Sequence, residues 1–562
     1  MRLLWSCIFV FNFLYVLQYV SCIDYSPIVT IPDGQVRGIE NQTIGENRTY
    51  YAYRGIPYAQ PPVGDLRFAA PVKNDPWSGV LNATGQNDGC TQMSSGIAII
   101  ATVSDVTGSE DCLYIDVYTT DLNSSLPVMV WFFGGGFNTG SSNSTGQPDY
   151  FLDNDVVFVS FNYRLGVFGF LSTEDDVIPG NWGLKDQVLA LKWVKENIEY
   201  FGGDSENITI FGQSAGAASV SYMINTNLTE GLFTRAIMES SSSLCLWALT
   251  REAENKAFFV GTQVGVITTD SQTLLDALRE VDYKKLKVAE NTVTIATFAI
   301  GNILAGLPFG PVQEPDSSEA VISGRSYEIL EYGNYNSVST LIGFNSNEGG
   351  AFEQYVAIAA LILLEYDLQL SRFAPYDLTD NDETKTLVGT EIRLHYFGVG
   401  LISLQASNLI TFADVDQFVR PIRETVNLMS QYGDVYYYEF SYEGDLGNSD
   451  RDFEGVGHGE ELNYLFYTGA EADDEDQLTR ERLVTLWTNF AKTGDPLSYD
   501  YYGVLENVTW IPNTADTNTT ETVYYLNIND TLTLETNPFQ TDWEYYEDIY
   551  ETYGNESYYT TY

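Results

Sequence analysis

The segment at residues 208–220 constrains the fold of this chain more than any other. A β-branched run, Ile208–Thr209–Ile210, leads into the turn Gly212–Gln213–Ser214–Ala215–Gly216, and small residues that suit a helix follow. A serine in a G-x-S-x-G turn between a strand and a helix is pushed out of the sheet, with its hydroxyl exposed and the next N–H free to bind an oxyanion. Gly and Ser also fill ordinary turns, so the motif gains its weight from the segments around it.

Two neighbouring segments support this interpretation. An apolar strand at 127–133 runs into Gly134, Gly135 and Gly136, where backbone N–H groups can approach an oxyanion with no Cβ in the way. Residues 184–198 place apolar side chains at three- and four-residue steps, which predicts an amphipathic helix. The glycines at 202 and 203 end this helix just before the strand that carries Ser214.

The candidates for a base are few, because the chain has two histidines, His395 and His458. His458 lies in a glycine-rich loop after a strand predicted at 434–442, whereas His395 lies in a helical pattern and is expected to be structural. Glu348 lies in the polar loop after a strand predicted at 338–344, and such strand ends often carry catalytic side chains in parallel sheets. The order Ser214, Glu348, His458 is that of α/β-hydrolases.

The chain resembles the type-B carboxylesterase and cholinesterase family of α/β-hydrolases from about residue 27 to residue 538. Besides the serine turn, the resemblance rests on five stretches: residues 53–68, 109–118, 162–166, 309–312 and 487–496. It implies an α/β fold with a central, mostly parallel sheet, helices on both faces and a small N-terminal antiparallel sheet. The small sheet would use strands predicted at 28–31 and 35–38 around Asp33–Gly34.

The resemblance also implies a role for each candidate residue. Ser214 is the expected nucleophile, His458 the base and Glu348 the acid of a serine esterase that forms an acyl-enzyme. The oxyanion is expected to be bound by the backbone N–H groups of Gly135, Gly136 and Ala215. No metal or cofactor is expected, since the sequence has no zinc-type Cys/His spacing and no P-loop.

Three departures from the family pattern refine this expectation. Phe133 stands where many members have His or Tyr, and Gln213 replaces the more common Glu before the nucleophile. Gly-Gln-Ser-Ala-Gly is the form associated with juvenile hormone esterases, which favours apolar ester substrates. The loop between Cys90 and Cys112 has no aromatic residue, so the usual cation–π seat for choline is missing and cholinesterase activity is disfavoured.

The cysteines follow the same resemblance. Cys90 and Cys112 match the first disulfide of the family, and closing a loop of that size contributes roughly 3 kcal/mol. Cys7 and Cys22 lie in the N-terminal segment described next, and Cys245 is left as an expected buried free thiol.

The N-terminus indicates export. Residues 1–22 have a short basic start and an uncharged apolar core, which is typical of a cleaved secretory signal peptide; an uncleaved anchor is the alternative. N-x-S/T sequons agree with a secreted, extracellular glycoprotein. The candidate asparagines are Asn41, Asn47, Asn82, Asn123, Asn143, Asn227, Asn507, Asn518 and Asn529; Asn555 is a further sequon, and Asn207 is the weakest because it adjoins the strand before Ser214.

The formal net charge of −50 disfavours nucleic acid and anionic membrane surfaces as partners and favours a soluble monomer or weak dimer. The acidic loop at 471–476 is expected to be a solvated surface. The Tyr-rich C-terminal tail, residues 541–562, is expected to be a disordered acidic end. A second hypothesis for the tail is sulfation of Tyr545, Tyr546, Tyr550 and Tyr553.

One large catalytic domain is expected at 23–540, with no integral membrane segment after signal cleavage. Apolar stretches near 294–308 and 355–364 predict a deep apolar gorge over the site, and the run at 356–364 is too short to span a bilayer. The predicted substrate is a small apolar ester. Two alternatives remain: a catalytically silent adhesion or matrix protein of the same fold, and a lipase that acts at interfaces.

Overall fold

The computed structural model describes residues 24–554 apart from 86–87, 95–97, 99, 301–305, 353–365, 377, 449–453, 501–502 and 516–521. The predicted signal peptide and the apolar run at 356–364 lie outside the described residues. None of the described helices is long and apolar enough to cross a bilayer.

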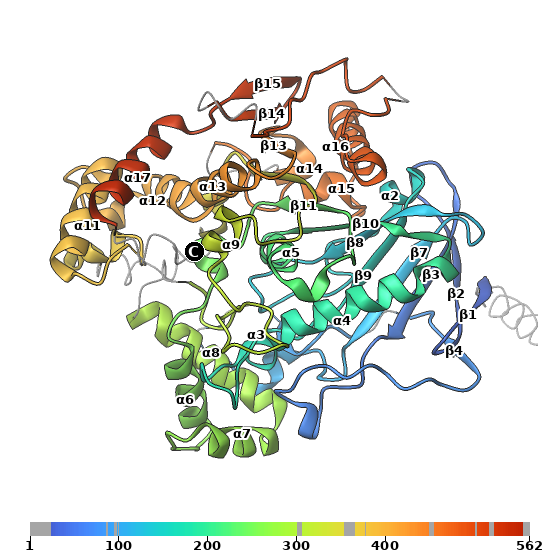
Figure 1. Ribbon diagram of the computed structural model, residues 1–562, viewed down its shortest axis with the longest axis horizontal. Helices are drawn as coiled ribbons and strands as arrows, with labels where there is room; N and C mark the ends of the chain where they lie inside the picture. Colours follow the sequence, from blue (N-terminus) through green and yellow to red (C-terminus); the bar gives the residue numbers. More distant parts are fainter. Residues whose placement is uncertain are drawn as a thin grey trace, which may run out of the picture.

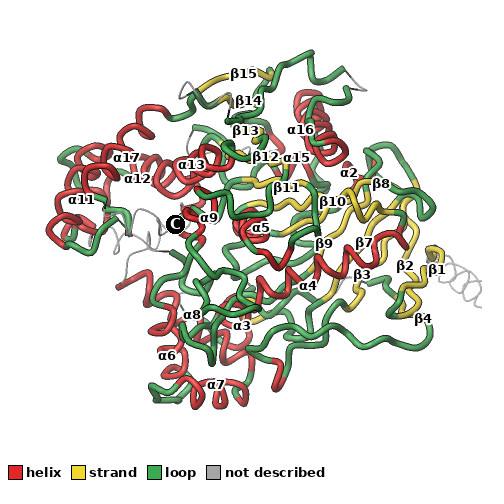
Figure 2. The backbone as a smooth tube through the Cα atoms, in the orientation of Figure 1, coloured by secondary structure: helices red, strands yellow, loops and turns green. Residues whose placement is uncertain are grey.

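A thirteen-stranded sheet runs through the described part of the chain, from β1 at one edge to β15 at the other (Figure 2). Its order is β1-β2-β3-β7-β9-β8-β10-β11-β12-β13-β14-β15, and β4 pairs with β2. The strands are β1 (Tyr25–Ile31), β2 (Gly34–Gln42), β3 (Thr49–Pro57), β4 (Val80–Asn82), β7 (Tyr114–Thr119), β8 (Leu126–Phe132), β9 (Val157–Phe161), β10 (Gly203–Gln213), β11 (Arg235–Glu239), β12 (Ser339–Asn345), β13 (Val435–Phe440), β14 (Tyr524–Ile528) and β15 (Leu532–Thr536). A separate small antiparallel sheet pairs β5 (Gln92–Met93) with β6 (Val106–Thr107).

The centre of the sheet is parallel from β9 to β14. Its strands are continuous apolar runs, such as Val157–Phe161, in which every residue is buried. Such runs are typical of parallel strands that helices cover on both faces. The predicted N-terminal strands pair antiparallel as β1 and β2, and they join the edge of the large sheet through β3 and β7.

Helices cover both faces of this sheet (Figure 1). On β10, Thr209 Oγ1 donates a hydrogen bond to a carbonyl of α16 (3.5 Å). A Cβ on Gly212, by contrast, would point toward the start of α5. Alternate residues of a strand point to opposite faces, so α16 and α5 lie on opposite sides of the sheet. The helices are α2 (Asp149–Asp153), α3 (Gly166–Phe170), α4 (Trp182–Asn197), α5 (Ala215–Asn225), α6 (Ala253–Gln263), α7 (Ser271–Glu280), α8 (Tyr283–Ile300), α9 (Ser326–Glu331), α11 (Asp382–Phe397), α12 (Ala406–Asp414), α13 (Arg420–Met429), α14 (Asp445–Asn448), α15 (Leu462–Leu465), α16 (Asp474–Thr493) and α17 (Gln540–Tyr553).

The elements predicted around the candidate residues are confirmed. The amphipathic pattern at 184–198 is helix α4, and the strand before Ser214 is β10. The strands predicted before Glu348 and His458 are β12 and β13, which are neighbours in the sheet. Because β10, β12 and β13 are parallel, their carboxyl ends meet at one edge.

The prediction of a disordered C-terminal tail is wrong for residues 541–553. These residues form α17, which packs beside α11 (Figure 1). Tyr546 and Tyr550 are buried on its inner face, under the guanidinium of Arg420 at 5.3 and 4.9 Å. Buried hydroxyl groups are out of reach of a modifying enzyme, so the sulfation hypothesis fails for these two tyrosines.

The acidic loop at 471–476 is also not solvated throughout. Asp473 caps α16 by accepting from the N–H groups of Glu475 and Asp476, and acidic residues favour this end of a helix. Asp476 is buried, and its carboxylate accepts from Tyr464 Oη at 3.1 Å and from the Leu446 N–H at 3.2 Å. Part of the acidic run therefore has a structural role.

Candidate active site

Ser214 stands at the sharp turn between β10 and α5. Its backbone angles are φ 59° and ψ −126°, outside the regions that a non-glycine residue normally occupies. The glycines of the motif are explained by space, because a Cβ on Gly216 would lie 2.0 Å from the carbonyl oxygen of Phe132. The turn is held by a hydrogen bond from the Ser214 N–H to the Glu239 carbonyl (2.8 Å). Strain of this kind is frequent at functional sites.

The imidazole of His458 lies between Ser214 and Glu348. Its Nε2 is 2.8 Å from Ser214 Oγ, and its Nδ1 is 2.5 Å from Glu348 Oε2. Burial lowers the pKa of His458, but the charge and hydrogen bond of Glu348 outweigh burial and the net pKa is raised. The glycine-rich loop that the sequence singled out thus brings His458 to the serine.

Glu348 begins a 3₁₀ turn (Glu348–Phe352) just after β12 ends at Asn345. The side chain is fully buried. Its second oxygen, Oε1, accepts a hydrogen bond from the Asn345 N–H at 2.7 Å. Both carboxylate oxygens therefore have fixed partners, and the carboxylate cannot rotate away from the imidazole.

The three glycines after β8 form a tight turn, residues 134–139, which we call the glycine turn. Gly135 and Gly136 have φ of +113° and +59°, and a Cβ on Gly135 would lie 2.3 Å from the Thr139 carbonyl oxygen. A Cβ on Gly134 would lie 3.1 Å from Ser214 Cβ, so the turn lies directly against the serine. Ala215 is the first residue of α5, where the N–H groups have no partner inside the helix.

Phe133 does not point at the serine. Its ring stacks on Tyr163 at 4.4 Å between centroids, and the Tyr163 hydroxyl donates to the Phe133 carbonyl. His395 also has a structural environment, as predicted: it lies on α11, stacks on Tyr545 at 4.0 Å, and has Nε2 3.5 Å from Asp542. These contacts leave His458 as the histidine of the site.

Two buried glutamates beside the site were missed in the sequence. Glu461 accepts a short hydrogen bond from Asn345 Nδ2, and Glu239 accepts from Trp487 Nε1 at 2.5 Å. Burial raises the pKa of both carboxyls, and the nearby charge of Glu348 adds to the effect on Glu461. Glu461 follows His458 by three residues in the same glycine-rich loop, and this closeness in sequence is a signal for its place beside the site.

Gln213 also reaches the imidazole. Its Nε2 lies 3.3 Å from His458 Nε2, on the same side as Ser214 Oγ. The amide carries no charge, so the family's usual negative charge at this position is absent next to His458.

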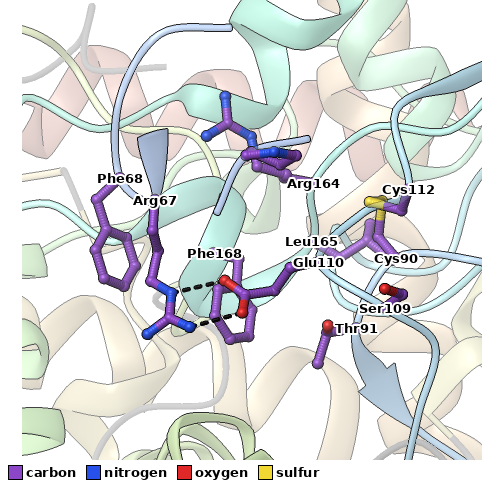
Figure 3. A pocket seen from close by; sticks show the side chains of 11 residues that line it. Arg67, Phe68, Cys90, Thr91, Ser109, Glu110, Cys112, Arg164, Leu165 and Phe168 are labelled. Atoms are coloured by element: carbon purple, nitrogen blue, oxygen red, sulfur yellow. Dashed lines mark hydrogen bonds and ion pairs between the residues drawn. A yellow bond between two sulfur atoms is a disulfide. The ribbon is translucent and has the colours of Figure 1, made fainter. Parts of the chain in front are cut away.

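The predicted disulfide joins Cys90 and Cys112. It lines a small pocket with a bidentate ion pair, in which Arg67 donates to Glu110 with both distances at 2.6 Å (Figure 3). None of Ser214, Glu348 and His458 lines this pocket, so the pocket is separate from the candidate catalytic residues. Cys245 is a buried free thiol, as predicted. Within the described residues, no cluster of acidic, His and Cys side chains could hold a metal ion.

The candidate glycosylation sites differ in exposure. Five of the asparagines are exposed: Asn47, Asn82, Asn123, Asn227 and Asn507. Asn41, Asn143, Asn207 and Asn529 are partly buried, and Asn207 is engaged by a short hydrogen bond from Arg235. Asn518 and Asn555 lie outside the described residues.

The sheet order, the strained serine at the end of β10 and the hydrogen-bonded histidine define an α/β-hydrolase. The sequence profile described as "Carboxylesterase family" matches residues 25–546. The chain therefore belongs to the carboxylesterase family, and it is a carboxylic ester hydrolase.

Similar proteins cover nearly the whole chain. The venom carboxylesterase-6 of Apis mellifera is 34% identical over 510 residues, which is 86% of this chain and 89% of that protein. The juvenile hormone esterase of Tribolium castaneum is 35% identical over 511 residues, 84% of each chain. The crystal structure of juvenile hormone esterase from Manduca sexta, with OTFP covalently attached, superimposes with a TM-score of 0.81 at 26% identity, covering 93% of this chain and 99% of that one.

Proposed function

We propose that the protein is a secreted serine carboxylesterase that uses Ser214 as nucleophile, His458 as general base and Glu348 as the acid that orients the imidazole. One observation carries the proposal: an unbroken line of contacts joins Ser214 Oγ to His458 Nε2 (2.8 Å) and His458 Nδ1 to Glu348 Oε2 (2.5 Å). Such a line lets an imidazole take a proton from a serine hydroxyl while a carboxylate stabilises the resulting imidazolium.

In the proposed reaction, Ser214 Oγ attacks the ester carbonyl carbon while His458 Nε2 takes the hydroxyl proton. The tetrahedral intermediate collapses, the bond to the alcohol oxygen breaks, and His458 returns the proton to the departing alcohol. Water then attacks the acyl-enzyme with the same base, which releases the carboxylic acid and restores Ser214. The raised pKa of His458 is consistent with an imidazolium that is stabilised during both steps.

The N–H groups of Gly135, Gly136 and Ala215 are the proposed donors to the oxyanion. Positive φ angles at both glycines and the contact of the turn with Ser214 support this role. Preorganised donors of this kind act where charge develops, and losing one typically lowers turnover by about 10²- to 10³-fold.

An apolar ester is the proposed substrate. The ring of Phe418 lies 5.1 Å from the His458 ring, and Trp247 lies 5.9 Å from Phe418. Leu307 borders Gly136, because its Cδ1 would lie 3.7 Å from a Cβ at that position. The similarity to two juvenile hormone esterases and the Gln213 motif favour juvenile hormone-like apolar esters within this class.

Secretion is part of the proposal because residues 1–22 have the composition of a signal peptide. The exposed sequon asparagines and the disulfide agree with an oxidising compartment.

The test is hydrolysis of p-nitrophenyl and methyl esters, from acetate to long acyl chains and including a juvenoid methyl ester, by the secreted protein. A Ser214→Ala variant is measured beside it. We expect activity that the substitution abolishes. A folded wild-type protein that hydrolyses none of the esters and does not react with an organophosphate would instead support a silent adhesion protein, and a strong preference for emulsified long-chain esters would support a lipase.

A further inference from the structure

Helix α8 buries an ion pair next to the glycine turn. Lys287 Nζ lies 2.7 Å from Glu290 Oε1, and both side chains are 1% exposed. Burying two charges costs free energy that their attraction seldom returns in full, so a pair of this kind is poorly explained by stability alone. Its other contacts show what it positions.

Lys287 contacts the glycine turn directly. Its ammonium donates a short hydrogen bond to Asn138 Oδ1, two residues after Gly136. The Asn138 N–H in turn donates to the Gly135 carbonyl at 3.1 Å. Because a carbonyl and the next N–H belong to one rigid peptide plane, fixing the Gly135 carbonyl also fixes the Gly136 N–H.

Glu290 reaches the same turn from the other side, through the start of α3. Its Oε2 accepts from the Val167 N–H at 2.9 Å. The preceding residue, Gly166, donates its N–H to the Phe137 carbonyl at 2.7 Å. A Cβ on Gly166 would lie 2.4 and 2.6 Å from the two Glu290 oxygens, so the glycine allows this close approach.

The same helix also holds the loop that the disulfide closes. Asn291 donates to the Ala98 carbonyl at 2.7 Å and accepts from the Ala98 N–H at 3.0 Å. Residues 287, 290 and 291 of α8 thus bind three segments that are far apart in sequence. Figure 1 shows α8 beside α3, and the two helices are in contact.

We propose that Lys287 and Glu290 are positioning residues that hold the glycine turn so that the Gly136 N–H keeps the orientation needed to bind the oxyanion. The proposal rests on the proposed esterase function. The ion pair acts through Asn138 on one side of the glycine turn and through Val167 and Gly166 on the other. Neither charged side chain contacts the substrate in this proposal.

The test is the double variant Lys287→Met/Glu290→Gln, which removes both charges at similar side-chain volume. We expect kcat for a p-nitrophenyl ester to fall about tenfold to a hundredfold, because small misplacements of oxyanion donors are costly. KM is expected to stay within about threefold, since the N–H groups bind the oxyanion more strongly than the ground-state carbonyl. Inhibition by a trifluoromethyl ketone, whose serine adduct carries an oxyanion, should weaken by a similar factor.

A second buried pair supplies the matched control. Lys185 and Glu314 lie 2.6 Å apart, and Glu314 accepts from Asn181 and Val321. Lys185→Met/Glu314→Gln should leave kcat within about twofold of wild type. Equal losses in both double variants, or an unchanged kcat in the Lys287/Glu290 variant, would overturn the proposal.

Two further results complete the design. If the double variant does not fold, Asn138→Leu decides, because it keeps the ion pair and removes its link to the glycine turn. A lower kcat in that variant supports the proposal, and an unchanged kcat overturns it. Wild-type activity that depends on Ser214 separates these outcomes from a failure of the proposed function itself.

Discussion

Replacing Glu348 by Gln tests the proposed triad at its most constrained point. Glu348 Oε1 accepts from the Asn345 N–H, and Oε2 faces His458 Nδ1. An amide has one acceptor and one donor end. If its oxygen stays on the Asn345 N–H, its NH₂ group faces Nδ1, which must then give up its proton. The imidazole is left with its proton on Nε2, where it cannot accept the proton of Ser214.

The structure sets the size of the effect. Turning the amide to restore the productive tautomer leaves two buried N–H donors facing each other, each costing about 1–3 kcal/mol when unsatisfied. Together they cost about 2–6 kcal/mol, which is between roughly 30-fold and 26,000-fold in population at about 1.36 kcal/mol per factor of ten. Loss of the carboxylate charge beside the imidazolium adds to this, so we expect kcat to fall about 10³-fold or more.

The assay is single-turnover acylation by a p-nitrophenyl ester, with circular dichroism as the check on folding. Glu460→Gln is the matched control, because Glu460 is in the His458 loop and its Oε1 accepts from the Gly457 N–H at 2.7 Å. That variant should stay within about threefold of wild type. A folded Glu348→Gln protein that keeps more than about a tenth of the wild-type acylation rate would refute the reasoning.

Three other predictions follow from described contacts. Gln213→Glu places a carboxylate next to His458 Nε2; it should raise the pKa of His458 and move the acid limb of kcat/KM to higher pH in a pH–rate profile. Burial raises the pKa of Asp116 from 3.8 to about 6, against hydrogen bonds from Ser142 and Gly55. A carboxyl whose pKa is higher in the folded state than in the unfolded state lowers stability above its folded pKa and has no effect below its unfolded pKa. Asp116→Asn should therefore raise the free energy of unfolding by up to about 3 kcal/mol at pH 7.5. Near pH 3.5 that free energy should stay unchanged; both values are measured by urea denaturation. Cys90→Ser/Cys112→Ser removes a cross-link between residues 22 apart in sequence and should lower that free energy by roughly 3 kcal/mol and depress Tm.

The residues of the candidate site could be predicted because each one follows a strong local signal. Ser214 lies in a G-x-S-x-G turn after an apolar strand, and Glu348 and His458 follow strands that the structure places side by side as β12 and β13. The buried Glu239 gave no such signal. Its environment depends on Trp487, which is 248 residues away in sequence and packs onto it from α16. Long-range burial of this kind cannot be read from local composition.

The C-terminal helix shows how composition can mislead. Residues 541–553 are acidic and rich in tyrosine, and this composition predicted disorder. Tyr546, Ile549, Tyr550 and Tyr553 nevertheless recur at three- and four-residue steps, and the first three are the buried residues of α17. The periodic signal was present, because tyrosine can bury its ring as an apolar group.

The residues of the proposed triad are far apart in sequence although they are in hydrogen-bond contact in the structure. Ser214 and His458 are 244 residues apart, and Glu348 and His458 are 110 apart. The strands that bring them together can pair only after large loops have closed, and this loop-closure entropy must be met before the contacts stabilise the chain. During refolding from urea, helical circular dichroism should therefore return before esterase activity does. The return of enzymatic turnover would then mark the step in which β10, β12 and β13 come into register.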